Sequence, residues 1–192
     1  MFTMAGPIGI WSGTEPSSDK PRSCMEEVSL HDISFRSINP PDMAQLEKWY
    51  AMTDELGYAT GFKRLDEVRE KLLSYPMTSM MIIHGEEQAA GFVCYELKNM
   101  NGKNVAWIHI LLVDPAFQNR GIGSWTIRKL LEWFESMDTA AVVVSVSEQN
   151  HRGLKFWENL GFSRSLDLER ILSGFGTKGV VIMKRYLERR CF

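Results

Sequence analysis

The residues best placed to do chemistry form a short turn rich in glycine and polar side chains. Residues 112–123 read LVDPAFQNRGIG, the pattern of a strand that runs through a turn into a helix. Gly121 and Gly123 permit a tight bend in which consecutive backbone N–H groups face one way, and the following helix adds the positive end of its dipole. The segment Gln118 to Gly123 is therefore suited to hold an anion such as a pyrophosphate.

Three other interpretations compete for this turn. A P-loop needs Lys followed by Ser or Thr after its last glycine, and Ser124-Trp125 does not supply them. A dinucleotide fingerprint needs Gly or Ala where Thr126 stands, and it opens a parallel βαβ unit, whereas the strands before this turn read as antiparallel. A tight strand-to-helix turn with no ligand is the third interpretation, and a single GxG pattern favours it.

The charge of the chain excludes a general attraction to polyanions. Among its 192 residues, 22 Lys and Arg stand against 24 Asp and Glu, for a formal net charge of -2. We therefore expect neither nucleic acid nor membrane as a partner. Three separated cysteines without a CxxC pair argue against a disulfide framework and against a metal site. Without a signal peptide or a long apolar run, a cytoplasmic protein is expected.

A second ordered motif follows downstream, where residues 150–162 read NHRGLKFWENLGF. Together the two segments resemble the GNAT superfamily of N-acetyltransferases, whose cofactor motif is Gln or Arg, two residues, Gly, one residue, and Gly or Ala. The family's downstream motif is an Asn, a small residue, an aromatic pair and a Gly-Phe ending. The matching positions are Gln118, Gly121 and Gly123 in the first motif and Asn150, Gly153, Phe156, Trp157, Gly161 and Phe162 in the second.

The resemblance implies the GNAT fold and acetyl-CoA as the cofactor. This α/β (α+β) fold has a mixed, mostly antiparallel sheet of about six or seven strands, flanked by about four helices and splayed at the cofactor site. In the family the pantetheine arm lies in the splayed gap and pairs with backbone groups like an extra strand. Carried over, the cofactor-binding residues are Leu111, Leu112, Val113, Gln118, Asn119, Arg120, Gly121, Ile122, Gly123, Ser124, Asn150, Phe156 and Trp157.

One position departs from the family pattern. Family members usually carry Tyr where this chain has Trp157, and that hydroxyl is thought to protonate the departing thiolate. An indole N–H donates a hydrogen bond but is too weak an acid to give up its proton. Trp157 is therefore expected either to pack against the cofactor arm or to be a core aromatic residue, with protonation left to water, to the amine or to another residue.

A base is needed because most amines are protonated at neutral pH and only the neutral form attacks a thioester. His109 is the first candidate, since the arylalkylamine branch of the family has a catalytic His at this offset before the cofactor turn. Period two places it on one strand face with Trp107 and Leu111. Glu96 is the second candidate, acting directly or through water, beside Tyr95.

The acceptor is expected to be an amine, either a small molecule or a peptide. Asp54 and Glu55 lie in a predicted loop, where they could attract a cationic amine, and Tyr95 and Trp107 are further candidates for acceptor binding. The activity is then acetyl transfer by direct attack through a tetrahedral intermediate, or CoA binding without turnover. A homodimer is a family-level expectation.

The strands and helices that must position these residues are predicted to follow an N-terminal extension. Residues 1–27 mix Gly, Pro, Ser and charge without periodicity and are predicted to be flexible, which leaves residues 28–192 as the GNAT domain. We predict helices at 43–52, 65–73, 124–137 and 152–159, a loop at 53–63 and a turn at 174–179. The predicted strands are 33–38, 79–84, 88–97, 105–113, 140–146, 162–168 and 180–186, the second to fourth of them antiparallel.

Overall fold

The structure is a computed structural model that describes residues 30–172 and 179–188. The extension predicted for residues 1–27 and nearly all of the turn predicted for residues 174–179 lie outside the described residues. The described residues contain three single-turn 3-10 helices, of which Leu30–Asp32 precedes the first strand and Pro40–Asp42 and Pro115–Phe117 connect larger elements.

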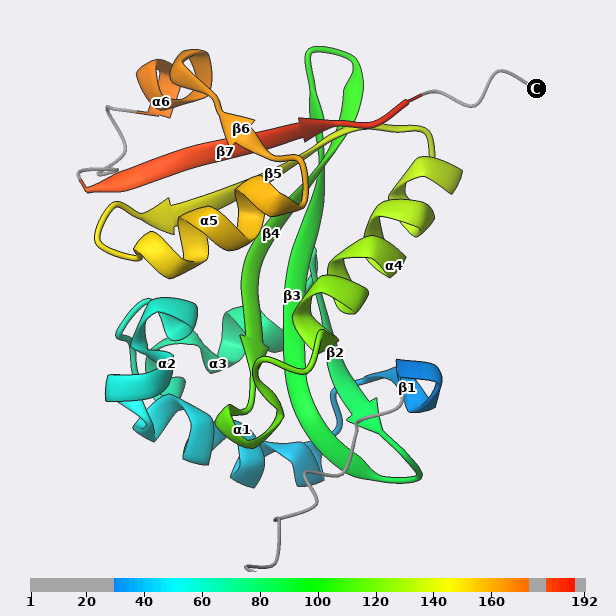
Figure 1. The fold of residues 1–192 in the computed structure, drawn as a ribbon, viewed down its shortest axis with the longest axis vertical. Helices are drawn as coiled ribbons and strands as arrows, with labels where there is room; N and C mark the ends of the chain where they lie inside the picture. Colours follow the sequence, from blue (N-terminus) through cyan, green and yellow to red (C-terminus); the bar gives the residue numbers. More distant parts are fainter. Residues whose placement is uncertain (1–29, 173–178, 189–192) are drawn as a thin grey trace, which may run out of the picture.

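Among the described residues, seven strands form one sheet in the order β1-β2-β3-β4-β5-β7-β6 (Figure 1). Neighbouring strands are antiparallel except β4 and β5, which are parallel. This mixed, mostly antiparallel sheet confirms the predicted fold class. The strands are β1 (Ile33–Ser37), β2 (Met77–His84), β3 (Gln88–Met100), β4 (Lys103–Val113), β5 (Thr139–Ser147), β6 (Ser163–Arg164) and β7 (Val180–Tyr186).

The described residues form six α-helices, which cover both faces of the sheet (Figure 1). Helices α4 and α5 pack on one face, together with the inward side chains of β3, β4, β5 and β7. Helices α1, α2 and α3 pack on the opposite face over β2, β3 and β4, and α6 covers the same face over β5 and β7. The helices are α1 (Met43–Ala51), α2 (Thr53–Thr60), α3 (Leu65–Leu73), α4 (Ile122–Ser136), α5 (His151–Asn159) and α6 (Leu166–Leu172).

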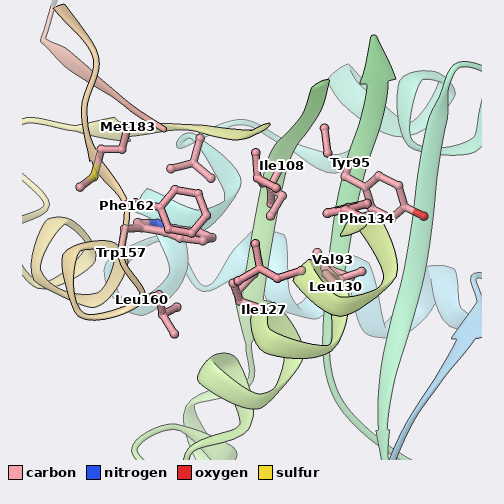
Figure 2. Packing of buried hydrophobic residues seen from close by; sticks show 14 of the residues in the cluster. Val93, Tyr95, Ile108, Ile127, Leu130, Phe134, Trp157, Leu160, Phe162 and Met183 are labelled. Carbon is pink, nitrogen blue, oxygen red and sulfur yellow. The ribbon is translucent and has the colours of Figure 1, made fainter. Parts of the chain in front are cut away.

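The core beneath α4 explains why this segment is a helix (Figure 2). Ile127, Leu130 and Phe134 recur at helical spacing and are at most 1% exposed. They meet β-branched residues of β5, among them Val142 and Val144. Burying each such side chain contributes roughly 1.5–3 kcal/mol, so this face holds α4 firmly against the sheet.

Strands β4 and β5 separate before either one ends. Their parallel ladder runs from the Asn104–Thr139 pair to the Ile108–Val144 pair and then stops. Both strands continue, β4 as far as Val113 and β5 as far as Ser147, and Figure 1 shows them diverging. The sheet is therefore splayed at the carboxyl end of β4, as predicted.

A β-bulge lies in the middle of β4. Cys94 pairs with Ile110 and Tyr95 pairs with Ile108, so His109 is the extra residue between them. The bulge breaks period two, because Trp107 packs toward α6 whereas Leu111 packs with the residues beneath α4. The prediction that His109 shares one face with both of them is therefore wrong for Leu111.

The loop predicted for residues 53–63 is wrong, because most of that stretch is α2. Asp54 and Glu55 lie in its first turn, where negative side chains favour the positive end of the helix dipole. Gly61 ends the helix with a left-handed φ of 67°, and its N–H donates to Gly57 O.

The strand predicted for residues 162–168 is also mostly wrong. Only Ser163–Arg164 pairs with β7, and α6 begins two residues later. The Glu169 carboxylate of α6 accepts from Arg164 Nε at 2.9 Å and from the backbone N–H of Ile182 at 3.1 Å. Because this side chain occupies a β7 donor, it replaces the backbone partner that a longer strand would supply.

Candidate functional site

A cavity of about 680 Å³ opens at the place where β4 and β5 diverge. Its walls come from α2 on one face of the sheet, from α5 on the other, and from the turn between β4 and α4. The cavity therefore passes through the gap in the splayed sheet. It is lined by Glu55, Leu56, Tyr58, Ala59, Leu111, Val113, Phe117, Gln118, Asn119, Gly121, Ile122, Gly123, Ser124, Gln149, Asn150, His151, Arg152, Gly153 and Phe156.

Asp114 fixes the turn that forms the floor of the cavity. Its Oδ1 accepts from the backbone N–H of Ala116 at 2.8 Å, and its Oδ2 accepts from Trp49 Nε1 at 2.7 Å. The Trp49 side chain is fully buried on α1, so the turn is tied to the core on the other side of the sheet. Gln118 closes the turn by donating from Nε2 to Val113 O at 2.9 Å.

The first turn of α4 faces the cavity with its backbone donors uncapped. The N-cap residue Gly121 has a left-handed φ of 82° and no side-chain cap. Gly121, Ile122, Gly123 and Ser124 all line the cavity. The first N–H groups of a helix lack partners within the helix, so this end binds an anion through those N–H groups and the dipole.

The fold itself does not require a glycine at position 123. A Cβ built there would meet its nearest atoms, in Phe156 and Val113, at 3.5 and 3.7 Å, which are ordinary van der Waals contacts. Glycine inside a helix is less stable than alanine by about 0.8–1.0 kcal/mol. Close approach of a ligand to the backbone is a physical reason for a glycine at this position.

The start of α5 faces the same cavity from across the gap. Asn150 caps this helix by accepting from Gly153 N–H at 2.8 Å. Arg152 lines the cavity and donates from Nη2 to Asn119 Oδ1, which joins α5 to the turn. Sequence reasoning did not find Arg152, because its proximity to residue 119 exists only in the tertiary structure.

The aromatic pair of α5 divides between cavity and core. Phe156 lines the cavity. Trp157 is 8% exposed and makes edge-to-face contacts with Phe156 and Phe162, at centroid distances of 5.1 and 4.9 Å. Figure 2 shows Trp157 beside Phe162 in the core. Trp157 therefore lies in the hydrophobic core and is not among the residues that line the cavity. Its packing against the cofactor arm stays a prediction.

The two candidate bases meet on the face opposite α4. Glu96 of β3 pairs with Trp107 of β4, and His109 Nε2 lies 3.3 Å from Glu96 Oε2. The His109 ring stacks on Trp107 with centroids 6.2 Å apart and planes 16° from parallel. Both titratable side chains lie outside the cavity lining, but Leu111, two residues after His109, lines it.

Burial lowers the pKa of His109 below its ordinary value of 6.5. The hydrogen bond and the negative charge of Glu96 act in the opposite direction and raise this pKa. The loss of solvation prevails, so the imidazole is neutral at pH 7 and has a lone pair available for a proton.

Other residues selected from the sequence lie away from these two places. Tyr95 is 2% exposed and packs edge-to-face on Phe134, 5.0 Å between centroids, on the α4 face. The Leu112 side chain is fully buried beneath the helices of the opposite face. Arg120 lies over the ring of Phe117, 5.9 Å from its centroid. None of the three side chains, nor Asp54, lines the cavity.

Helix α2 brings an aromatic residue to the cavity that the sequence did not single out. Tyr58 lines the wall one helical turn after Glu55 and meets Phe62 edge-to-face with centroids 5.2 Å apart. Tyr58 would have emerged from the sequence if residues 53–60 had been interpreted as a helix, because Glu55 and Tyr58 then share one face.

Within residues 30–172 and 179–188, no cluster of three or more His, Cys, Asp or Glu side chains could hold a metal ion. Among the same residues, no helix has the length and apolar character needed to cross a membrane.

Comparison with known proteins agrees with this geometry. The model of the Acetyltransferase (GNAT) family matches residues 43–162. An uncharacterised N-acetyltransferase of Methanocaldococcus jannaschii is 36% identical over 75 residues, 38% of this chain and 33% of that protein. Human N-alpha-acetyltransferase 30 is 29% identical over 159 residues, 77% of this chain and 43% of that protein. The chain thus spans less than half the length of either relative.

Solved structures support the fold. An acetyltransferase from Thermus thermophilus superposes with a TM-score of 0.65 at 18% identity, over 81% of this chain and 97% of that one. A spermidine N-acetyltransferase from Vibrio cholerae, in complex with CoA and spermine, superposes with a TM-score of 0.64 at 14% identity, over 83% and 98%. Because the family match covers more than half of the 192 residues, the chain belongs to the Acetyltransferase (GNAT) family.

Proposed function

We propose that this protein is an N-acetyltransferase that binds acetyl-CoA in the cavity between the splayed strands. The observation that carries the proposal is the uncapped start of α4, whose donors face the cavity from Gly121 to Ser124. An anion held there is the pyrophosphate of CoA, and Arg152 adds a positive charge across the gap. The unpaired edge of β4 beyond Ile108 then receives the pantetheine arm.

The reaction is direct attack on the thioester. The amine nitrogen bonds to the carbonyl carbon, and a tetrahedral intermediate forms whose oxyanion is held by a backbone N–H near Leu112 or Val113. The carbon–sulfur bond then breaks, so the products are an amide and the CoA thiol. The thiolate takes its proton from water or from the amine, because Trp157 is no acid.

His109 is the proposed base that removes the proton from the ammonium form of the acceptor. Its neutral imidazole accepts that proton on one nitrogen, while the contact of Nε2 with Glu96 fixes the ring and its tautomer. This tautomer leaves Nδ1 as the accepting nitrogen. The pair works as a base and the group that orients it, which is a common arrangement in acyl transfer.

The proposed acceptor is the α-amino group at the start of a peptide chain. Support comes from the relatives named N-alpha-acetyltransferase 30, one of which aligns with 77% of this chain. An α-amino group has a pKa of about 7.7–8.0, against about 10.4 for a lysine amine, so a larger share of it is neutral at pH 7. Glu55 in the cavity wall attracts the charged form.

CoA binding without turnover is the second candidate function. One observation favours it, namely that a buried tryptophan stands at the position where the family usually has a tyrosine. Titration with CoA, followed by an assay of thiol release from acetyl-CoA with peptides, polyamines and arylalkylamines, separates the two candidates. Acceptor-dependent thiol release supports the enzyme. CoA binding without release across the whole panel supports the second candidate.

A further inference from the structure

A lysine lies beside the two candidate bases and forms an ion pair with one of them. Lys98 Nζ lies 3.0 Å from Glu96 Oε2, the same oxygen that His109 Nε2 approaches at 3.3 Å. Its ammonium also lies over the ring of Trp107, 5.6 Å from the centroid. Alternation along a strand puts Glu96 and Lys98 on one face of β3, so both reach toward the histidine side of the bulge.

We propose that Lys98 is a positioning residue that holds the Glu96 carboxylate in place beside His109 and keeps the imidazole unprotonated until it accepts the proton of the amine. The inference rests on the proposed function, in which His109 is the base. It adds a charge that the pair needs in order to work near neutral pH.

The physical reason lies in the effect of Glu96 acting alone. A carboxylate within hydrogen-bond reach of an imidazole favours the protonated ring, and a protonated ring cannot accept the proton of the substrate. The Glu96 side chain is only 15% exposed, so water screens this effect weakly. A lysine on the same carboxylate oxygen offsets its charge while leaving the contact that orients the ring.

This lysine differs from an ordinary surface ion pair. Exposed Lys–Glu pairs contribute little, because two long mobile side chains must be fixed in solvent. Here the carboxylate is largely buried and the lysine lies over an indole, which limits its movement. The Trp107 ring that lies under the Lys98 ammonium also stacks on His109, so Trp107 contacts both side chains.

The charged groups that shift the pKa of His109 lie on two neighbouring elements, β3 and α3. On β3, Glu96 raises the pKa of His109 and Lys98 lowers it. On α3, Lys71 also lowers it. Burial acts in the same direction as the two lysines, and the resulting pKa lies below the ordinary value of 6.5.

The test is a Lys98→Gln variant of the full chain, studied by two measurements. The pH at which His109 titrates, followed by NMR of its ring Cε1–H, should rise by about half a pH unit because the Glu96 charge is no longer offset. The acid limb of kcat/KM should move upward by the same amount with the best peptide acceptor. A Lys98→Arg variant, which keeps the charge, should titrate close to the parent.

Lys103→Gln is the matched control, since it removes one lysine from an exposed position at the start of β4. It should leave both measurements unchanged. If His109 titrates at the same pH in the folded Lys98→Gln variant as in the parent, the role of Lys98 is wrong. If His109→Gln keeps the full rate and the acid limb of the parent, the proposal that His109 is the base is wrong instead.

Discussion

Replacing Gly123 with aspartate should affect the proposed cofactor site without lowering the stability of the fold. Gly123 is the second residue of α4, and a Cβ there meets only ordinary contacts, the nearest at 3.5 Å. A carboxylate in the first turn of a helix is stabilising by about 0.3–1 kcal/mol, and the removal of a helical glycine acts in the same direction. We therefore expect the melting temperature of the ligand-free variant to stay level or to rise by roughly 1–4 °C.

CoA binding should respond in the opposite direction. The new carboxylate would stand beside the donors that we propose for the pyrophosphate. Two unit charges 4 Å apart repel by about 1 kcal/mol even at the dielectric constant of water, and a pyrophosphate carries about two of them. A penalty of about 2 kcal/mol or more corresponds to a rise in Kd of about 30-fold or more.

Gly123→Asn is the matched variant, because asparagine has the shape of aspartate without its charge. Isothermal titration of CoA into the two variants measures the charge effect alone, and the difference between them should shrink as salt is added. Equal CoA affinities for Asp and Asn at low salt would refute the assignment of this helix start as the pyrophosphate site.

Three further predictions concern the same structure. Gly121→Ala and Gly161→Ala place alanine at nearly the same left-handed φ, 82° and 81°, so each should lower the free energy of unfolding by roughly 1–2 kcal/mol. Only Gly121→Ala should also weaken the binding of CoA, as measured by titration. Asp114→Ala leaves the buried Trp49 indole without its acceptor and should destabilise the fold by roughly 1–3 kcal/mol in urea unfolding, while an equal stability of variant and parent would contradict this. Because the folded-state pKa of His109 is lowered, the unfolded chain binds more protons between that pKa and 6.5, so stability should fall as pH falls through this range. Urea unfolding across these pH values should show a smaller loss for His109→Gln than for the parent, and equal losses would show that another group is responsible.

The geometry of the turn between β4 and α4 could be predicted from the sequence because its signals are local. A strand pattern, two glycines and a helix pattern within residues 112–136 specify the geometry of a helix start, whatever the rest of the chain does. The structure has these elements in that order, with Gly121 as N-cap of α4. The splay between β4 and β5 followed only from the resemblance to the family, since no residue pattern by itself sets the point where two strands part.

The predictions for residues 53–63 and 162–168 were wrong because tertiary packing decides the secondary structure of both segments. Gly57 and the polar residues around it weaken the helical pattern of residues 53–60, yet α2 buries Leu56 against the sheet. A strand was predicted for residues 162–168, but Leu168 is buried with β5 and β7 because the segment turns into α6. Both helices lie on the same face of the sheet, α2 at the cavity between β4 and β5 and α6 beside Trp107.

The candidate base shows most clearly what the sequence alone determines. The sequence offered Glu96 as a titratable residue on a predicted strand, and it offered His109 through the resemblance to one branch of the family. The strand pattern predicted period two along β4. The bulge at His109 cancels that period, so Leu111 turns to the cavity wall while the imidazole stays with Trp107 and Glu96. A local pattern therefore determines which groups can carry the chemistry, whereas the register between neighbouring strands decides which of them meet, because that register depends on contacts far apart in the chain.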